Sequence, residues 1–288
     1  MRQDFVKTKH HYVWKNYLRP WSENGQIWTK REGKTFLTSL ENVGQKRFFY
    51  EVFALTNAEI KILNAFIQGT HPSAHPTLFD TFKMFLDITY GDEEKRKTGL
   101  EDYHAHTEGY TVKVLNCIYE RNFDFLKFEH LRNNFCYFVG LQFMRTRRQF
   151  EQLSLVMRRF DLIEDYREYM NDINIKSIVK AFQFIMADIT GNWLSQAKIK
   201  FIQTVGDETL ITCDQPVINT SSDPLHRETP ATEMNLLYPL TPTLAMLASD
   251  KDIPYEGLNT LQVKNFNQLL KNYSFEQTYA ISEKALLE

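Results

Sequence analysis

The chain has 288 residues, of which 43% are hydrophobic and 14% aromatic, so it is long enough to bury a sizeable core and too apolar to be disordered over most of its length. Its 34 basic and 36 acidic residues give a formal net charge of -2, which excludes a global field that would draw the protein to nucleic acid or to an acidic membrane. Any such partner would have to bind a local patch.

The cysteines indicate a reducing setting. The chain has three cysteines, Cys117, Cys136 and Cys213. Their odd number, their wide spacing and the lack of a CxxC pair argue against a disulfide framework and against a zinc site. The residues up to His10 are polar and charged with no apolar run behind them, and no window is apolar enough to span a membrane. We therefore expect a cytoplasmic protein with no membrane partner.

The first predicted unit, residues 10–53, is an aromatic opening followed by a β-hairpin. The opening, residues 10–21, reads His-His-Tyr-Val-Trp-Lys-Asn-Tyr-Leu-Arg-Pro-Trp and is too aromatic for a disordered tail. Turn residues separate two extended segments, residues 26–30 and 35–40, which predicts the hairpin. Residues 48–53 fit either a third extended piece or a buried linker.

Helical periodicity dominates residues 57–190, where apolar side chains recur every three to four positions. The spacing predicts a first helix with Asn57 as its N-cap and Gly69 just past its end. A charged stretch at 92–99 is expected to be a connector. The predicted helices cover residues 57–67, 76–90, 108–121, 129–146, 150–160, 162–170 and 175–189.

From residue 198 the apolar period changes to two, which indicates that the chain leaves the helices for a sheet. Residues 198–205 and 209–213, joined by a turn at Gly206, are predicted to pair antiparallel. A stretch rich in Ser, Asp, Pro and Thr at 219–233 is expected to be a surface loop. Two further strands and a closing helix are predicted at 236–240, 243–248 and 259–273.

Arg145 is the first candidate site residue. It follows Leu141 by four positions on the apolar face of a predicted helix, where a guanidinium needs a carboxylate or an anionic ligand. The candidate carboxylates are Asp214, Glu108 and Glu120. Such a pairing fits a structural ion pair that joins helices to sheet as well as it fits a site.

Asp214 is the second candidate. It lies where a predicted strand has to end, because Pro216 cannot donate to a β-ladder. Catalytic carboxylates are commonly displayed at strand ends next to loops, and an Asp there caps its own backbone in a turn just as often.

The histidines form the third candidate set. His10 and His11 are adjacent, so in an extended segment they point to opposite sides and at most one enters a shared pocket. His11 is our candidate general acid or base, although a core histidine bonded to a backbone carbonyl fits the sequence at least as well. His104 and His106 would share one side of a strand, but they have no obvious third ligand, so no metal site is predicted.

A basic run is the fourth candidate. Arg145-Thr146-Arg147-Arg148 is followed by two more arginines at 158–159. Such a run near Tyr and Phe can hold phosphates and stack bases, although it is more often a solvated helix face.

The chain has no P-loop, GxGxxG, GxSxG, HExxH or kinase motif set, which excludes the most easily recognised nucleotide-binding and hydrolase classes.

These segments, in this order, resemble a family of bacterial proteins known as domain of unknown function 4238. That family opens with His-His-Tyr-Val-Pro-x-x-Tyr-Leu-x-x-Phe, continues through helices that hold an Arg-Thr pair, and ends with a Thr-Ser-Asp-x-Pro-Val strand and a Leu-Ser-Pro segment. Trp14 replaces the proline, Trp21 the phenylalanine and Cys213 the serine. The resemblance implies the order of the elements and no established activity. The matching positions are residues 10–13, Tyr17-Leu18, Arg145-Thr146, 212–217, 240–242 and Asn267.

We expect one α+β domain over residues 1–288, in which a mainly helical body packs against a small, largely antiparallel sheet. The N-terminal hairpin and the later strands, within residues 198–288, form that sheet. His11, Arg145 and Asp214 are predicted to converge at the junction: His11 transfers a proton, Arg145 holds a phosphate or stabilises negative charge, and Asp214 orients one of them. The expected substrate-binding residues are His10, Tyr17, Glu108, Thr146 and Arg148.

This set predicts an enzyme directed at a phosphodiester or a nucleotide, such as a nuclease-like effector of a bacterial defence or toxin system, with no cofactor. Its partner would be nucleic acid or a nucleotide. The alternative is a non-catalytic binding or scaffolding protein, in which the same residues form a buried ion-pair network and the aromatic residues contact a protein partner or a second copy of the chain.

Overall fold

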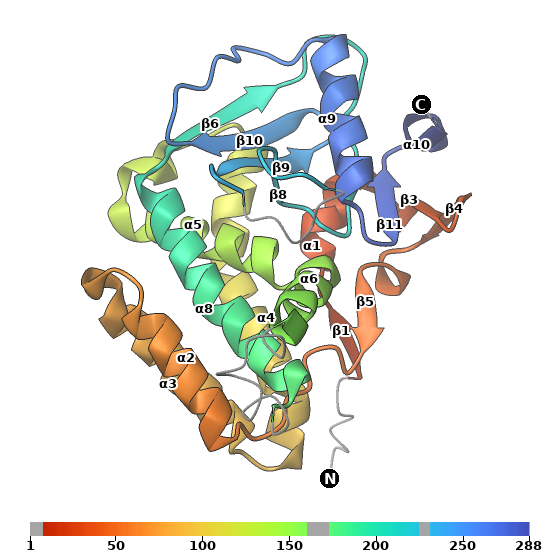
Figure 1. Cartoon of the computed structure of the whole chain (residues 1–288). Helices are drawn as coiled ribbons and strands as arrows, with labels where there is room; N and C mark the ends of the chain where they lie inside the picture. The colour runs from red at the N-terminus through yellow and green to blue at the C-terminus, as the bar shows by residue number, and fades with distance from the viewer. Residues whose placement is uncertain (1–7, 160–172, 225–230, 288) are drawn as a thin grey trace.

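The chain folds into a helical layer and a layer of antiparallel strands that meet along one face (Figure 1). The computed structural model describes residues 8–159, 173–224 and 231–287. Helices account for most of the regular structure in these ranges, so the predicted α+β class is confirmed. None of the described helices combines the length and the apolar run that a bilayer crossing requires.

The N-terminal unit contains the predicted hairpin, in which β3 (Gln26–Arg31) pairs with β4 (Lys34–Ser39). Before and after it, β1 (Lys9–His11) and β5 (Gln45–Arg47) pair with each other. Residues 48–53 form no strand and are the buried linker of the two alternatives. The other short elements here are α1 (Lys15–Leu18), η1 (Arg19–Trp21), β2 (Ser22–Glu23) and η2 (Leu40–Asn42).

Side-chain caps determine where two helices begin. Thr56, not Asn57, is the N-cap of α2, because its hydroxyl accepts the N–H of Glu59 while the Glu59 carboxylate accepts the N–H of Thr56. Asp92 caps α4 by accepting a backbone N–H at 2.8 Å, so the prediction of a connector at 92–99 was wrong. The helical elements are α2 (Asn57–Gln68), η3 (Pro72–Ala74), α3 (His75–Thr89), α4 (Glu93–Tyr119), η4 (Asp124–Lys127), α5 (Glu129–Met144), α6 (Arg147–Arg159) and α8 (Ile175–Gln196).

α5 and α8 form the axis of the helical layer because two glycines let their backbones touch. A Cβ on Gly140 would lie 2.3 Å from the carbonyl oxygen of Ala187, and one on Gly191 would lie 2.9 Å from the Cα of Tyr137. α2 and α3 lie along the outer side of this pair (Figure 1). The helix predicted at 162–170 lies outside the described residues.

One sheet lies between the helical layer and α9 (Thr260–Tyr273), with strand order β6-β10-β9-β8. Its side chains alternate between two cores: Tyr238 and Met246 pack with the helices, whereas Leu237 and Ala245 pack with α9. The strands are β6 (Lys198–Gln203), β8 (Ile218–Asn219), β9 (Asn235–Thr241) and β10 (Leu244–Ser249).

The N-terminal hairpin shares a second sheet with the late strands β7 and β11, in the order β2-β3-β11-β7, whereas the prediction placed all the later strands in one sheet with the hairpin. The predicted pairing of 198–205 with 209–213 was wrong, because β6 pairs with β10 and β7 pairs with β11. The backbone N–H of Val205 instead donates to the carbonyl oxygen of Leu258, in the segment that leads into α9. The remaining elements are β7 (Thr212–Cys213), β11 (Gln277–Ala280) and α10 (Glu283–Leu287).

Candidate functional site

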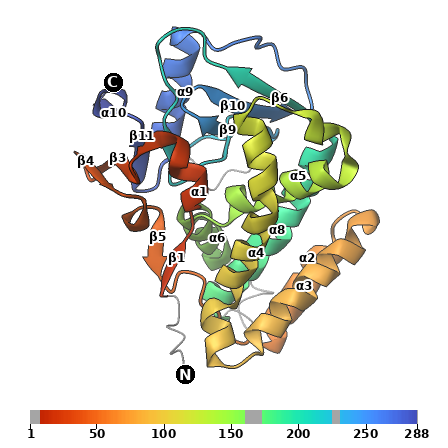
Figure 2. The ribbon, with the colours of Figure 1, turned by 180° about the vertical axis from the view of Figure 1, so that it is seen from behind.

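The aromatic opening folds back between the helices and the late strands. Figure 2 shows α1 at this junction. The buried Tyr17 hydroxyl donates to the carbonyl of Pro239 at 2.8 Å and lies 2.6 Å from the hydroxyl of Thr212. His10 is fully buried, and its Nδ1 accepts the N–H of Tyr50 at 2.9 Å. Both side chains that were expected to bind substrate therefore make internal hydrogen bonds.

Arg145 follows the last residue of α5 and is 3% exposed. Its guanidinium lies 2.6 Å from the Glu108 carboxylate of α4, so Glu108 is the partner among the three predicted carboxylates. Despite burial, the pKa of Arg145 is raised above its ordinary value, first by Glu108. The charge of Arg145 is thus balanced inside the protein.

Asp214 is fully buried, and its carboxylate accepts three backbone N–H groups. The donors are Phe275 at 2.7 Å, Glu276 at 2.7 Å and Gln277 at 3.0 Å. Burial raises the pKa of Asp214 to about 6, and these three donors act in the opposite direction. The carboxylate holds the connection between α9 and β11 in place.

His11 lies near enough to Arg145 to be influenced by its charge and remains partly exposed, but its Nε2 is buried and has no hydrogen-bond partner within the described ranges. Burial lowers the pKa of His11 to about 4, and Lys15 and Arg145 lower it further against the effect of Glu41. The imidazole is therefore neutral at pH 7. Among the described residues, no hydrogen bond or ion pair joins Asp214 to His11 or Arg145, and the charged groups of Asp214 and Arg145 are each bound by other partners.

The other predicted substrate contacts also connect segments of the chain. Thr146 caps α6 by accepting the N–H of Gln149 at 3.3 Å, and it donates to the side chain of Gln215. Arg148 is 2% exposed and donates to the carbonyl oxygens of Tyr273 at 2.9 Å and Pro224 at 3.1 Å. Neither side chain is available to a phosphate in this arrangement.

Replacing His11 with glutamine is expected to reduce the acid sensitivity of the fold. The unfolded imidazole has a pKa near 6.5, so the unfolded chain binds a proton more strongly than the folded chain between pH 6.5 and 4. His11 therefore lowers stability as the pH falls through this window. When the pH falls from 7 to 4.5, the free energy of unfolding, measured in urea, should decrease by about 1–2 kcal/mol less in His11→Gln than in the wild type. This difference is reduced to account for the partial exposure of His11.

The matched control for this measurement is His106→Gln, because His106 is exposed on α4. Its stability should follow the pH dependence of the wild type. If all three proteins lose stability equally on acidification, the folded imidazole of His11 is not held in its neutral form.

A buried cluster that the sequence did not predict lies beside Arg145. A cavity of about 10 Å³ lies among α4, α5 and α8, and His104 and Lys180 are two of the side chains that line it. Among the described residues, both ring nitrogens of His104 and the Nζ of Lys180 are buried without a hydrogen-bond partner. The only sequence signal for this cluster was a lysine within the apolar run of α8. The residues that line the cavity are Tyr50, His104, Leu141, Arg145, Lys180, Gln183 and Phe184.

The His-x-His pair does not share one side, because α4 is a helix that buries His104 and exposes His106. Within the ranges described by the structure, no group of three His, Cys, Asp or Glu side chains is placed to hold a metal ion.

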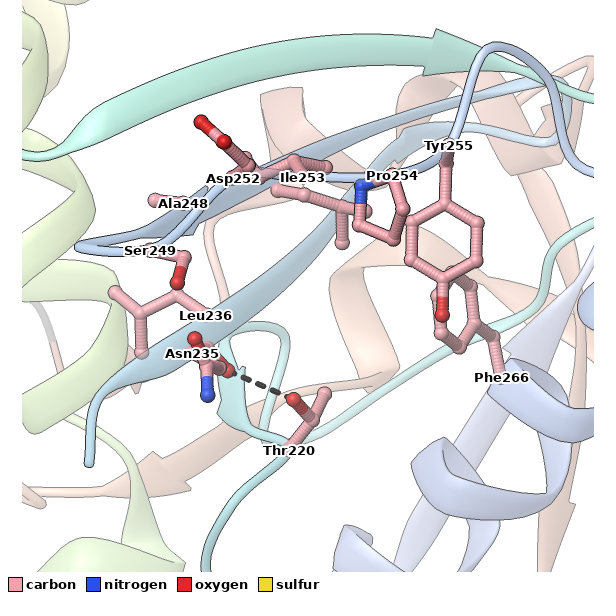
Figure 3. A pocket seen from close by; sticks show the side chains of 11 residues that line it. Thr220, Asn235, Leu236, Ala248, Ser249, Asp252, Ile253, Pro254, Tyr255 and Phe266 are labelled. Carbon is pink, nitrogen blue, oxygen red and sulfur yellow. Dashed lines mark hydrogen bonds between the residues drawn. The ribbon is translucent and has the colours of Figure 1, made fainter. Parts of the chain in front are cut away.

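Two hollows lie beside β9 and β10 and are together called the α9 groove. Figure 3 shows the first of them. The first has a volume of about 210 Å³ and the second of about 270 Å³, and they share Asn235 and Ser249. Figure 3 shows Tyr255 beside Phe266 at one end of the first hollow, and their ring centroids are 5.8 Å apart. No motif in the sequence indicated this groove, because its residues come from a loop, two strands and two helices. The residues that define it below are Trp193, Asn235, Ser249, Asp250, Tyr255 and Phe266.

Comparison with known proteins found one family. A family model described as "Protein of unknown function (DUF4238)" matches residues 9–284. Neither the curated proteins nor the solved structures contain a match. The match spans the aromatic opening, the helices and both sheets.

Proposed function

Because the chain belongs to the DUF4238 family of proteins of unknown function, we propose its function from its own geometry: it is a non-catalytic binding protein whose buried polar residues hold the fold together. The observation that carries this proposal is the internal use of Arg145 and Asp214, which are paired with Glu108 and with three backbone N–H groups. The cavity beside Arg145, of about 10 Å³, is far below the roughly 300–1,000 Å³ of a small-molecule site.

The α9 groove is the binding surface in this proposal, and its charges favour a cationic partner. Glu233 pairs with Lys251 at 2.6 Å, and a lysine of β6 pairs with Asp252. In the part of the chain that the structure describes, Asp250 accepts the indole N–H of Trp193, at 3.0 and 3.2 Å, and forms no ion pair. A phosphate would be repelled here, whereas an Arg or Lys side chain would be attracted.

A short segment of a protein partner fits the groove better than a cofactor does. Each hollow is smaller than the roughly 300 Å³ at which small-molecule pockets begin, so each suits one large side chain. The edge-to-face pair of Tyr255 and Phe266 offers an apolar contact in one hollow, and Asp250 offers a charge in the other. We assign the occupant as an extended peptide with an aromatic or aliphatic side chain close to a basic one.

Selection from a phage-displayed random dodecapeptide library on the immobilised full chain tests this assignment. The selected peptides should pair a basic with a large apolar residue. Their affinity should fall about tenfold or more in Asp250→Asn and in Tyr255→Ala, since an exposed or anchoring contact of this kind contributes about 1–2 kcal/mol. The control is Asp80→Asn, an exposed carboxylate on α3, which should bind as the wild type does.

A library that yields no binder, or binders that ignore both groove substitutions, would contradict the groove as the binding surface. Both outcomes leave the structural roles of Arg145 and Asp214 unaffected.

A nuclease-like enzyme is the second candidate, favoured by the unpartnered Nε2 of His11 close to Arg145. Hydrolysis of bis(p-nitrophenyl) phosphate by the purified chain distinguishes the two. We expect no hydrolysis that depends on His11. Turnover that is lost in His11→Ala and kept in His106→Gln would replace the binding proposal with the enzyme.

A cytoplasmic location is part of the proposal. Cys117, Cys136 and Cys213 are all free thiols, and two of them are buried, which suits a reducing compartment.

A further inference from the structure

The cavity beside Arg145 encloses polar atoms that have no acceptor. Lys180 is 1% exposed and His104 is 2% exposed. The Nζ of Lys180 and both ring nitrogens of His104 make no hydrogen bond in the described part of the chain. Buried polar groups are almost always paired, so three such atoms beside one cavity indicate that something occupies it.

The charges around the cavity are unbalanced at Lys180. Arg145 is neutralised by Glu108, at 2.6 Å. Lys180 forms no ion pair with any residue that the structure describes, and aromatic rings surround it: its Nζ lies 3.5 Å from the ring centroid of Phe49 and 4.6 Å from that of Phe150. Ring faces attract an ammonium group but supply no counter-charge.

We propose that this cavity binds one small monovalent anion of the halide class, with chloride as the physiological ligand. The anion accepts hydrogen bonds from the Lys180 ammonium and from an N–H of His104, and the Arg145 guanidinium adds to its electrostatic stabilisation. It supplies the counter-charge that the surrounding side chains do not provide.

Size selects this class of ligand. A volume of about 10 Å³ holds roughly one water-sized occupant, which excludes phosphate, sulfate and carboxylate ligands. A water molecule would also fit and would satisfy a neutral Lys180 amine, whereas only an anion compensates the ammonium form of Lys180. The positive charge of Arg145 at the same cavity disfavours a cation.

Anion binding is coupled to proton binding in this arrangement. Burial lowers the pKa of Lys180 well below its ordinary value, and Lys176 and Lys46 lower it further against the weaker effect of Glu151. His104, which faces the same cavity, also has its pKa lowered, by burial and then by Arg145 and Lys180. The anion binds the protonated ammonium, so its affinity rises as the pH falls.

Thermal unfolding in sodium chloride against sodium gluconate, at equal concentration, tests the proposal, because gluconate is too large for the cavity. Chloride should raise the melting temperature of the wild type in a saturable manner. A tenfold excess of chloride over its Kd lowers the unfolding equilibrium constant by about tenfold. The effect should be larger at pH 6 than at pH 9.

Lys180→Met should abolish the difference between the two salts, and Lys176→Met is the matched control. Lys176 is on the same helix and pairs with Glu51 at 2.8 Å, and it does not line the cavity. Its variant should keep the chloride response and extend it to higher pH, because Lys176 no longer lowers the pKa of Lys180. A chloride response that is absent in the wild type, or equal in Lys180→Met, would overturn the proposal.

A second measurement does not depend on the variant folding. Wild-type crystals grown in sodium bromide should show an anomalous difference peak in the cavity lined by His104 and Lys180. Density with no anomalous signal there would identify a water molecule and refute the anion site.

Discussion

Gly140→Ala is expected to destabilise the folded chain by about 3 kcal/mol, the upper part of the range for overpacked cores. The new Cβ would lie 2.3 Å from the carbonyl oxygen of Ala187, a backbone atom that cannot rotate away. This clash can be relieved only if α5 and α8, the axis of the helical layer, move apart. Urea unfolding followed by circular dichroism measures the loss as a lower transition midpoint.

Gly109→Ala is the matched control, because Gly109 lies inside α4 with nothing within 4 Å of an added Cβ. That variant should be up to about 1 kcal/mol more stable than the wild type, since alanine favours a helix. Equal midpoints for the two variants would show that the α5–α8 contact is looser than described. Gly191→Ala should resemble Gly140→Ala, because its Cβ would press on the backbone of Tyr137 at 2.9 Å.

Asp214→Ala is expected to cost about 3–5 kcal/mol, since it leaves the buried N–H of Gln277 and the partly buried N–H groups of Phe275 and Glu276 without their acceptor. Urea unfolding gives the loss of free energy. Hydrogen exchange adds a local measurement, because the amide of Gln277 at the start of β11 should exchange much faster relative to amides of α8.

The control for Asp214→Ala is Asp80→Asn, an exposed change that should stay within about 0.5 kcal/mol of the wild type. A stable Asp214→Ala protein that had lost ligand binding would give Asp214 a functional role in place of the structural one.

Local patterns were sufficient for most of the helical layer. The apolar spacing predicted α3 and α5 close to their observed bounds and the start of α8, because packing on one face imposes that spacing on each helix separately. The prediction ended α8 at residue 189, whereas the helix continues to Gln196. The charged first turns of α4 carry no apolar spacing, and only the Asp92 cap shows where that helix begins.

Strand pairing could not be predicted to the same extent. β7 and β8 have two residues each, too few for an alternating pattern. Gly206 suggested a hairpin after β6, but the partner of β6 is β10, which lies far along the chain. Strand partners depend on contacts between distant segments, whereas a turn signal is local.

For the candidate site too, some features could be predicted from local sequence and others could not. A guanidinium on an apolar helix face predicted that Arg145 has a buried partner, and Glu108 was among the candidates. The choice between a catalytic and a structural Asp214 could not be made from sequence, because its donors belong to the backbone and have no side-chain signature.

The sequence by itself determined the α+β class, the helical body, the N-terminal hairpin and the need for a carboxylate beside Arg145, because each follows from local spacing or from the cost of burying a charge. Only the tertiary structure decided that Asp214 faces the chain ahead of β11, that Lys180 lies unpaired beside a cavity, and that loop, strand and helix residues form the α9 groove. These features depend on how separate elements pack against one another, and packing brings together side chains whose separation along the chain carries no information about their contact.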